Sequence, residues 1–136
     1  MNIFLDTNVV LDFLLKRESF FAPARNVIAL CLNRKYPLYI SSVSFANISY
    51  LARKGCDGMS VNELLASLRA MLSVSTCDQN TVDNSLALNP KDFEDAMQYF
   101  SAEYVACDYI ITRNGKDFPQ SGIPILTPQE FIDQIN

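Results

Sequence analysis

The chain of 136 residues contains no histidine, no tryptophan and only four glycines. The lack of histidine excludes every mechanism in which imidazole is the base, the nucleophile or a metal ligand, including Ser-His-Asp hydrolysis and histidine-based ribonuclease chemistry. The four cysteines form no C-x-x-C pair, so no structural zinc site is expected. We expect buried or inert thiols in a reducing, cytoplasmic environment.

Long apolar runs and a secretory signal are also missing. The start MNIFLDTNVV has no basic region, and the apolar stretches are interrupted by Asp12, Lys16 and Arg17. We therefore expect no membrane contact. The length and an apolar content of 49% predict one globular domain over residues 1–136. The net charge of −4 argues against a basic protein that wraps duplexes, but not against a nuclease whose carboxylates bind metal.

Short apolar runs alternate with longer helical patterns along the chain. This order predicts an α/β domain with a mostly parallel sheet of about five strands. The expected strands are Asn2–Asp6, Pro37–Ser41, Leu72–Cys77, Tyr109–Thr112 and, at a sheet edge because of Pro124, Ile123–Leu126. Expected helices include Val9–Leu15, Ala22–Asn33 and Val43–Arg53.

Three further helices are predicted from their start signals. Ser60–Glu63 and Thr127–Glu130 have the form of capping boxes. Asn89–Asp92 has the same form, with Asn89 as the cap, Pro90 at the first helical position and Asp92 near the positive end of the dipole.

Polar groups follow the predicted strands, where parallel α/β sheets form their sites. Asp6 ends the first strand, and it is explained either as a helix cap or as a carboxylate for metal-dependent phosphoryl chemistry. After the fourth strand, Asn114 can be an ordinary turn residue and Asp117 a solvated one. Arg113 and Lys116 can hold phosphate oxygens or face water.

The helix after Asn89 carries a second carboxylate of interest. Its core face is predicted to hold Phe93, Ala96, Met97, Phe100 and Tyr104, and its solvated stripe Glu94, Gln98 and Ser101. Asp95 instead heads a stripe with Tyr99, Ala102 and Ala106, where a carboxylate needs a partner or a metal.

The helix around Asn47 is uncharged until Arg53 and Lys54, two cations that suit a helix end. It is therefore predicted to be buried, and Asn47 then needs satisfied hydrogen bonds. Phe13, Phe20 and Phe21 are expected in the core, with an exposed interface as the alternative.

Four segments together resemble the PIN domain family, in its VapC-like toxin branch. They are FLDTNVVLDFLL, SSVSFANISYLARK, DFEDAMQYFSAEYVACDYIITRNGKDF and IPILTPQEF, which span Ile3 to Phe131. The resemblance implies a three-layer α/β/α sandwich and an Mg²⁺- or Mn²⁺-dependent endoribonuclease. It also implies an RNA substrate, an antitoxin partner and a homodimer.

The resemblance assigns roles by position. Asp6 matches the first acidic residue, Asp95 the third and Asn114 the fourth, with Asp117 as a nearby carboxylate. These four are the expected metal ligands, and the three aspartates are the expected catalytic residues. Asn47 stands where many members have Glu, which removes one negative charge. Asn8, Asn47 and Thr112 are expected to support the site.

The implied chemistry needs no histidine, because a divalent ion can activate water held between carboxylates. RNA contact is assigned to local cations, since the net charge is negative. They are Arg53, Lys54, Arg113 and Lys116, with Lys16 and Arg17 as further candidates.

Two alternatives remain open at this stage. One is a phosphatase of the haloacid-dehalogenase type, although Asn8 stands where that class has its second aspartate. The other is a weak or inactive PIN fold that binds RNA or protein, which the loss of an acidic residue at Asn47 favours.

Overall fold

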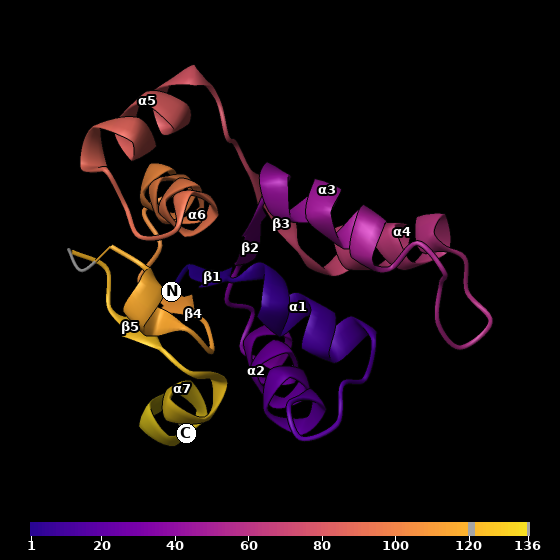
Figure 1. The fold of residues 1–136 in the computed structure, drawn as a ribbon. Coiled ribbons are helices and arrows are strands. Elements are labelled where there is room, and N and C mark those ends of the chain that lie inside the picture. The colour runs from indigo at the N-terminus through magenta and orange to yellow at the C-terminus, as the bar shows by residue number, and fades with distance from the viewer. Residues whose placement is uncertain (120–121, 136) are drawn as a thin grey trace.

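The computed structural model describes residues 1–119 and 122–135. It contains a parallel five-stranded sheet in the order β3-β2-β1-β4-β5, flanked by helices on both faces (Figure 1). The strands are β1 Ile3–Leu5, β2 Leu38–Ser41, β3 Ser73–Ser75, β4 Tyr109–Ile111 and β5 Ile125–Leu126. The helices are α1 Thr7–Leu14, α2 Phe21–Asn33, α3 Ser42–Leu51, α4 Val61–Met71, α5 Gln79–Leu88, α6 Phe93–Tyr104 and α7 Pro128–Ile135, with the 3₁₀ turn η1 at Gly115–Asp117.

Strand alternation divides the core in two. Ile3 and Leu5 of β1 lie in one hydrophobic cluster, whereas Phe4 between them lies in the other. Successive side chains of a strand point to opposite faces of a sheet, so a short apolar strand can serve both layers. The larger cluster joins β1 and β2 to α1, α2, α3, α4 and α7, and the smaller one joins β1 and β4 to α6.

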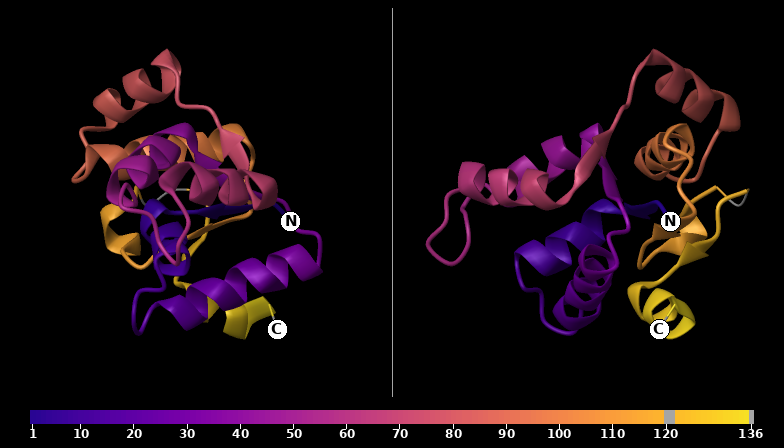
Figure 2. Two further views of the ribbon diagram at one scale, coloured as in Figure 1. Left: turned by 90° about the vertical axis from the view of Figure 1, so that its right-hand side faces the viewer. Right: turned by 180° about the vertical axis from the view of Figure 1, so that it is seen from behind.

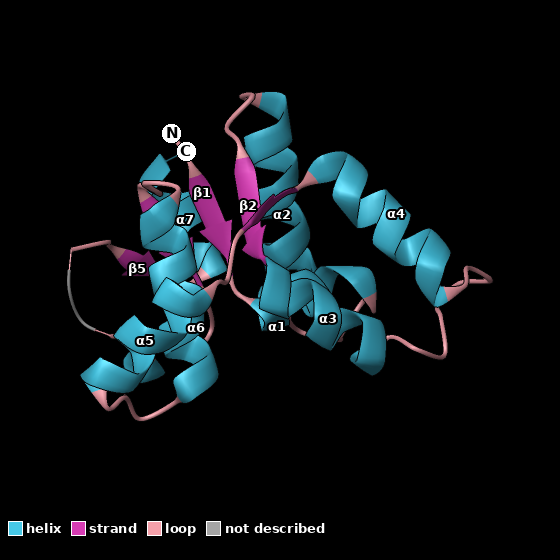
Figure 3. Ribbon diagram, turned by 90° about the horizontal axis from the view of Figure 1, so that it is seen from above, coloured by secondary structure: helices cyan, strands magenta, loops and turns pink. Residues whose placement is uncertain are grey.

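The helices form two unequal layers. α5 and α6 pack together on one side of the sheet, while α1, α2 and α7 lie on the other (Figures 1 and 2). α3 and α4 lie beside β2 and β3 and extend away from the sheet, as the view from above shows (Figure 3). The predicted three-layer sandwich with five parallel strands is therefore confirmed, including the edge position of β5 after Pro124.

The helix starts at Ser60 and Thr127 are confirmed, but the one at Asn89 is wrong. Ser60 and Glu63 form a complete capping box, and Thr127 and Glu130 exchange equivalent bonds. Asn89 instead ends a helix, α5, that the sequence analysis did not predict, and it adopts the left-handed conformation with φ 51°. Asn tolerates this conformation at a helix end, which the Asn-Pro pattern conceals.

The predicted faces of α6 are wrong in part, although Ala96 is buried in the core as predicted. Gln98 and Ser101, assigned to solvent, are fully buried, whereas Phe93 and Tyr104, assigned to the core, are exposed. Ser101 donates its hydroxyl to the backbone carbonyl of Thr76, so burial leaves it satisfied. Hydrophobic periodicity failed here because α6 packs polar side chains against the sheet edge.

The helix α3 is less buried than its composition predicts. Only Ser44 and Ile48 of this helix are fully buried, and Tyr50 and Leu51 are 64% and 49% exposed. Phe13 packs partly against the core and stacks on Phe21, whereas Phe20 is exposed. Among the described residues, no helix is long and apolar enough to cross a membrane.

Candidate active site

Asp6 lies directly after β1, at the carboxyl edge of the sheet and at the start of α1. It occupies the N-cap position, yet its side chain makes no capping hydrogen bond. Its Oδ2 accepts a hydrogen bond of 2.7 Å from the hydroxyl of Thr112, which follows the neighbouring strand β4. The residue is only 3% exposed. The carboxylate of Asp6 is therefore directed along the sheet edge and not into the helix that it precedes.

Burial raises the pKa of Asp6 above its ordinary value. Hydrogen bonds from Thr112, the side chain of Gln98 and the backbone of Thr7 oppose this rise, and Arg113 opposes it electrostatically. Asp6 takes part in no ion pair within residues 1–119 and 122–135. The buried carboxylate of Asp6 is thus held by uncharged hydrogen-bond donors, and none of these donors is a cation that would balance a negative charge.

Asp95 lies in the first turn of α6 and joins the same electrostatic group. The cap of this helix is Asp92, whose Oδ1 accepts the backbone N–H of Asp95 at 2.9 Å. Burial and repulsion from Asp6, Asp92, Glu94 and Asp117, in that order, raise the pKa of Asp95 to about 8. The charges of Asp6 and Asp117 thus both act on Asp95, although the three carboxylates do not converge into one closed cluster among the described residues.

Glu94 is a member of this group that the sequence analysis placed in solvent. Its Oε1 accepts a hydrogen bond of 3.3 Å from Nε2 of Gln98, and its carboxylate also bonds to the side chain of Asn47. Burial, followed by repulsion from Asp6 and Asp92, raises the pKa of Glu94. The sequence signal for it is the Glu-x-x-x-Gln spacing, which places both side chains on one side of the helix.

A buried polar network fixes Gln98. Its Oε1 accepts from the backbone N–H of Thr7 at 3.4 Å and from the hydroxyl of Ser44 at 3.5 Å. The hydroxyls of Thr7 and Ser44 are 2.6 Å apart, and that of Ser44 is 2.9 Å from Ser41. These contacts join α1, α3 and α6 at the carboxyl edge of the sheet.

The loop after β4 contributes the remaining predicted ligands. Asp117 is half-buried in η1, and its charge reaches Asp95. Asn114 is exposed, and its backbone N–H donates to the hydroxyl of Thr112 at 3.1 Å. Thr112 thus ties this loop to Asp6. Lys116 is exposed beside Asp117.

Arg113 has protein partners of its own. Its Nε and Nη2 lie 2.7 and 3.1 Å from the two carboxylate oxygens of Asp12, and its guanidinium lies 3.9 Å from the ring centre of Phe20. Arg17 approaches the same carboxylate and also Oδ1 of Asn8, both at 3.4 Å. Contact of Arg113 with RNA stays a prediction, but the ion pair already explains its position.

The other predicted residues lie around the entrance to the site. Asn8 and Asn47 line one shallow pocket together with Thr7 and Glu94. Arg53 and Lys54 are exposed at the end of α3, and the Arg53 guanidinium lies 4.3 Å from the ring centre of Tyr50.

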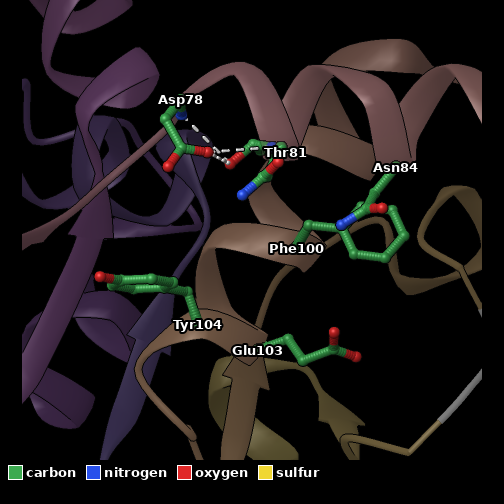
Figure 4. A pocket seen from close by; sticks show the side chains of 7 residues that line it. Asp78, Thr81, Asn84, Phe100, Glu103 and Tyr104 are labelled. Carbon is green, nitrogen blue, oxygen red and sulfur yellow. Dashed lines mark hydrogen bonds between the residues drawn. The ribbon is translucent and has the colours of Figure 1, made fainter.

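A second pocket lies between α5 and α6, towards the opposite end of α6 from Glu94 and Asp95. Figure 4 shows its lining side chains Phe100, Glu103 and Tyr104 below the Asp78–Thr81 hydrogen bonds that begin α5. It lies apart from the acidic residues described above.

Magnesium or manganese suits the donor chemistry of the acidic group. Carboxylate and amide oxygens are the ligands that these hard ions prefer. In the described part of the chain, no three acidic or cysteine side chains converge closely enough to enclose an ion. Mg²⁺ keeps several waters and uses one or two carboxylates, and a cation relieves the repulsion that raises the pKa of Asp95. The donor types are therefore those that a partly hydrated Mg²⁺ or Mn²⁺ would use.

Comparison with known proteins supports the same assignment. A family model described as PIN domain matches residues 2–116. The chain is 26% identical over 139 residues to Ribonuclease VapC1 of Aquifex aeolicus, covering 98% of this chain and 95% of that protein.

Solved structures give the same result. A toxin-antitoxin complex from Klebsiella pneumoniae matches with 25% identity and a TM-score of 0.64, over 94% of this chain and 98% of that one. VapBC2 from Rickettsia felis, bound to a DNA fragment from its promoter, matches in fold with 16% identity and a TM-score of 0.70, over 92% and 97%. Because the family model covers most of the chain, this chain belongs to the PIN domain family, and over nearly its whole length it is similar to the VapC-like proteins named above.

Proposed function

We propose that the protein is an Mg²⁺- or Mn²⁺-dependent endoribonuclease that acts as the toxin of a toxin–antitoxin pair. The observation that carries this proposal is the buried carboxylate of Asp6, which is held by neutral donors and whose charge helps to raise the pKa values of Glu94 and Asp95. A fold gains nothing in stability from crowding like charges, whereas a cation-dependent site requires it.

The residues have separate roles in this proposal. Asp6, Asp95, Asn114 and Asp117 would hold the ion. The bound ion supplies water of lowered pKa and neutralises charge on the phosphate. Thr112 orients Asp6 through its 2.7 Å hydrogen bond and positions the loop that carries Asp117. Asn8 and Asn47 line the approach to the acidic residues.

Exposed cations on both sides of the site are assigned to RNA phosphates. Lys116 lies beside Asp117, and Arg53 and Lys54 lie at the end of α3. Arg113 contributes charge from its ion pair with Asp12. An antitoxin partner is proposed because matched structures are toxin–antitoxin complexes. A homodimer stays a prediction.

One observation favours the alternative of a PIN fold that binds RNA or protein without cleaving. α3 carries Asn47 in place of an acidic residue and exposes Tyr50 and Leu51, an apolar surface suited to a protein contact. This alternative predicts retained partner binding without metal-dependent cleavage.

The test is cleavage of total cellular RNA by the purified protein with Mg²⁺ or Mn²⁺. We expect cleavage that EDTA stops and that Asp6→Asn abolishes. Asp83→Asn, an exposed aspartate of α5, is the matched control and should cleave like the wild type. Cleavage that survives Asp6→Asn contradicts the proposal. Mn²⁺ binding without cleavage of any RNA favours the alternative.

A further inference from the structure

Asn47 on α3 and Glu94 on α6 line one pocket, although 46 residues lie between them in the sequence. Asn47 and Glu94 line this pocket with Thr7 and Asn8, and their side chains form a hydrogen bond. Asn47 has no charge, while Glu94 brings a carboxylate to the same place from the opposite helix. The charge missing from α3 is thus present on α6.

Hydrogen bonds hold the Glu94 carboxylate in this position. Gln98 donates to its Oε1 at 3.3 Å and also hydrogen-bonds to Asp6. Gln98 is fully buried, and Thr7 and Ser44 occupy its carbonyl oxygen. Because its amide is fixed at both ends, Gln98 sets the position of Glu94 relative to Asp6.

No cation explains why Glu94 stays there. Within the described residues Glu94 forms no ion pair, and its charged neighbours Asp6, Asp92 and Asp95 all repel it. A half-buried glutamate with only repulsive charges would gain from turning to water. Two amides, from Asn47 and Gln98, instead hold it at the site.

We propose that Glu94 supplies the carboxylate that the acidic centre lacks at Asn47, and that Asn47 and Gln98 position it towards the metal ion and its waters. This inference rests on the proposed function and deepens it. It predicts that the negative charge of Glu94 is required for ion binding, and that a carboxylate at position 47 can replace it.

The test measures Mn²⁺ affinity by calorimetric titration and RNA cleavage in parallel. Glu94→Gln keeps the size and hydrogen-bonding capacity of the side chain but removes its charge. We expect a loss of Mn²⁺ affinity of about 10- to 100-fold, with a parallel loss of cleavage. The double variant Asn47→Glu/Glu94→Gln, which moves the carboxylate to α3, should regain most of the affinity.

Glu103→Gln is the matched control, since it removes a glutamate charge from the far end of the same helix (Figure 4). It should bind Mn²⁺ and cleave RNA like the wild type. Thermal unfolding in EDTA checks that each variant is folded.

The outcomes separate this inference from the proposed function. Suppose that the wild type binds Mn²⁺, that Asp6→Asn does not, and that Glu94→Gln binds it as tightly as the wild type. This result overturns the role of Glu94 and leaves the proposed function standing. Wild type that binds no Mn²⁺ overturns both. Loss of affinity in Glu94→Gln, with none in Glu103→Gln, supports the inference, and recovery in the double variant shows that the position of the charge matters.

Discussion

Two aspartates at the two ends of α1 are equally buried but have opposite surroundings. Asp6, before the helix, is 3% exposed and accepts hydrogen bonds from neutral groups. Asp12, on the helix, is 1% exposed and receives two bonds from Arg113 and a longer one from Arg17. The same residue type, at similar depth, is paired with a cation in one place and has no ion-pair partner among the described residues in the other.

The difference separates a stabilising carboxylate from a functional one. Arg113, which pairs with Asp12, directly follows Thr112, which bonds to Asp6. The loop after β4 therefore brings a cation to one aspartate and only a hydroxyl to the other. A buried charge without a cation is costly, so the fold retains it where an external ion is required.

The largest expected effect on stability comes from removing the ion pair between Asp12 and Arg113. Asp12→Ala leaves the partly buried Arg113 without its carboxylate, and we expect a loss of about 3 kcal/mol in the free energy of unfolding. Urea unfolding at pH 7 measures it. Asp83→Ala, at an exposed position of α5, should change stability by less than about 0.5 kcal/mol. A loss in Asp12→Ala no greater than in this control would show that the ion pair does not stabilise the fold.

At the acidic group of Asp6 and Asp95, removal of a carboxylate should stabilise the fold in the absence of metal. The pKa of Asp95 is about 8 in the folded protein and 3.8 as its ordinary value. Over this range the folded state binds more protons than the unfolded state, so stability without metal falls as pH rises from about 4 to 8. Asp95→Asn should remove part of this dependence and raise the melting temperature by several degrees at pH 8.

Thermal unfolding in EDTA at a series of pH values measures this effect. Asp133→Asn, an exposed aspartate of α7, is the control and should keep the wild-type pH dependence. A melting temperature of Asp95→Asn below that of the wild type at pH 8 would contradict the repulsion described here.

The smallest expected effect is stabilisation by the ion itself. Mn²⁺ at ten times its dissociation constant should stabilise the wild type by about 1.4 kcal/mol, because only the folded state gathers the carboxylates. Asp6→Asn should show no such gain, whereas Asp83→Asn should match the wild type. Thermal shift with and without EDTA measures it. If Mn²⁺ stabilised Asp6→Asn as much as the wild type, the ion would bind somewhere other than at Asp6.

Several helix and strand positions could be predicted because their signals are local. The capping boxes at Ser60 and Thr127 involve residues three apart, and the strand at Ile3–Leu5 is a short apolar run before a polar residue. The helix α5 was missed because its apolar pattern is weak, and Asn89 was assigned to the wrong helix because Asn suits both ends.

Within the candidate site, the positions of Asp6 and Asp117 after strands followed from chain order alone. The solvent assignment of Gln98 and Glu94 failed because periodicity treats polar residues as exposed, whereas here they pack against α1 and α3. The roles assigned to the site residues stay predictions until the variants are measured.

The sequence by itself determined the alternating α/β order, the carboxylate after the first strand and the exclusion of imidazole chemistry. These depend on residue type and short spacing. Only the tertiary structure decided that Asn47 meets Glu94 and that Arg113 pairs with Asp12 and not with Asp6. Such contacts join residues far apart in the chain, so they depend on the strand order and on how each helix is rotated against the sheet.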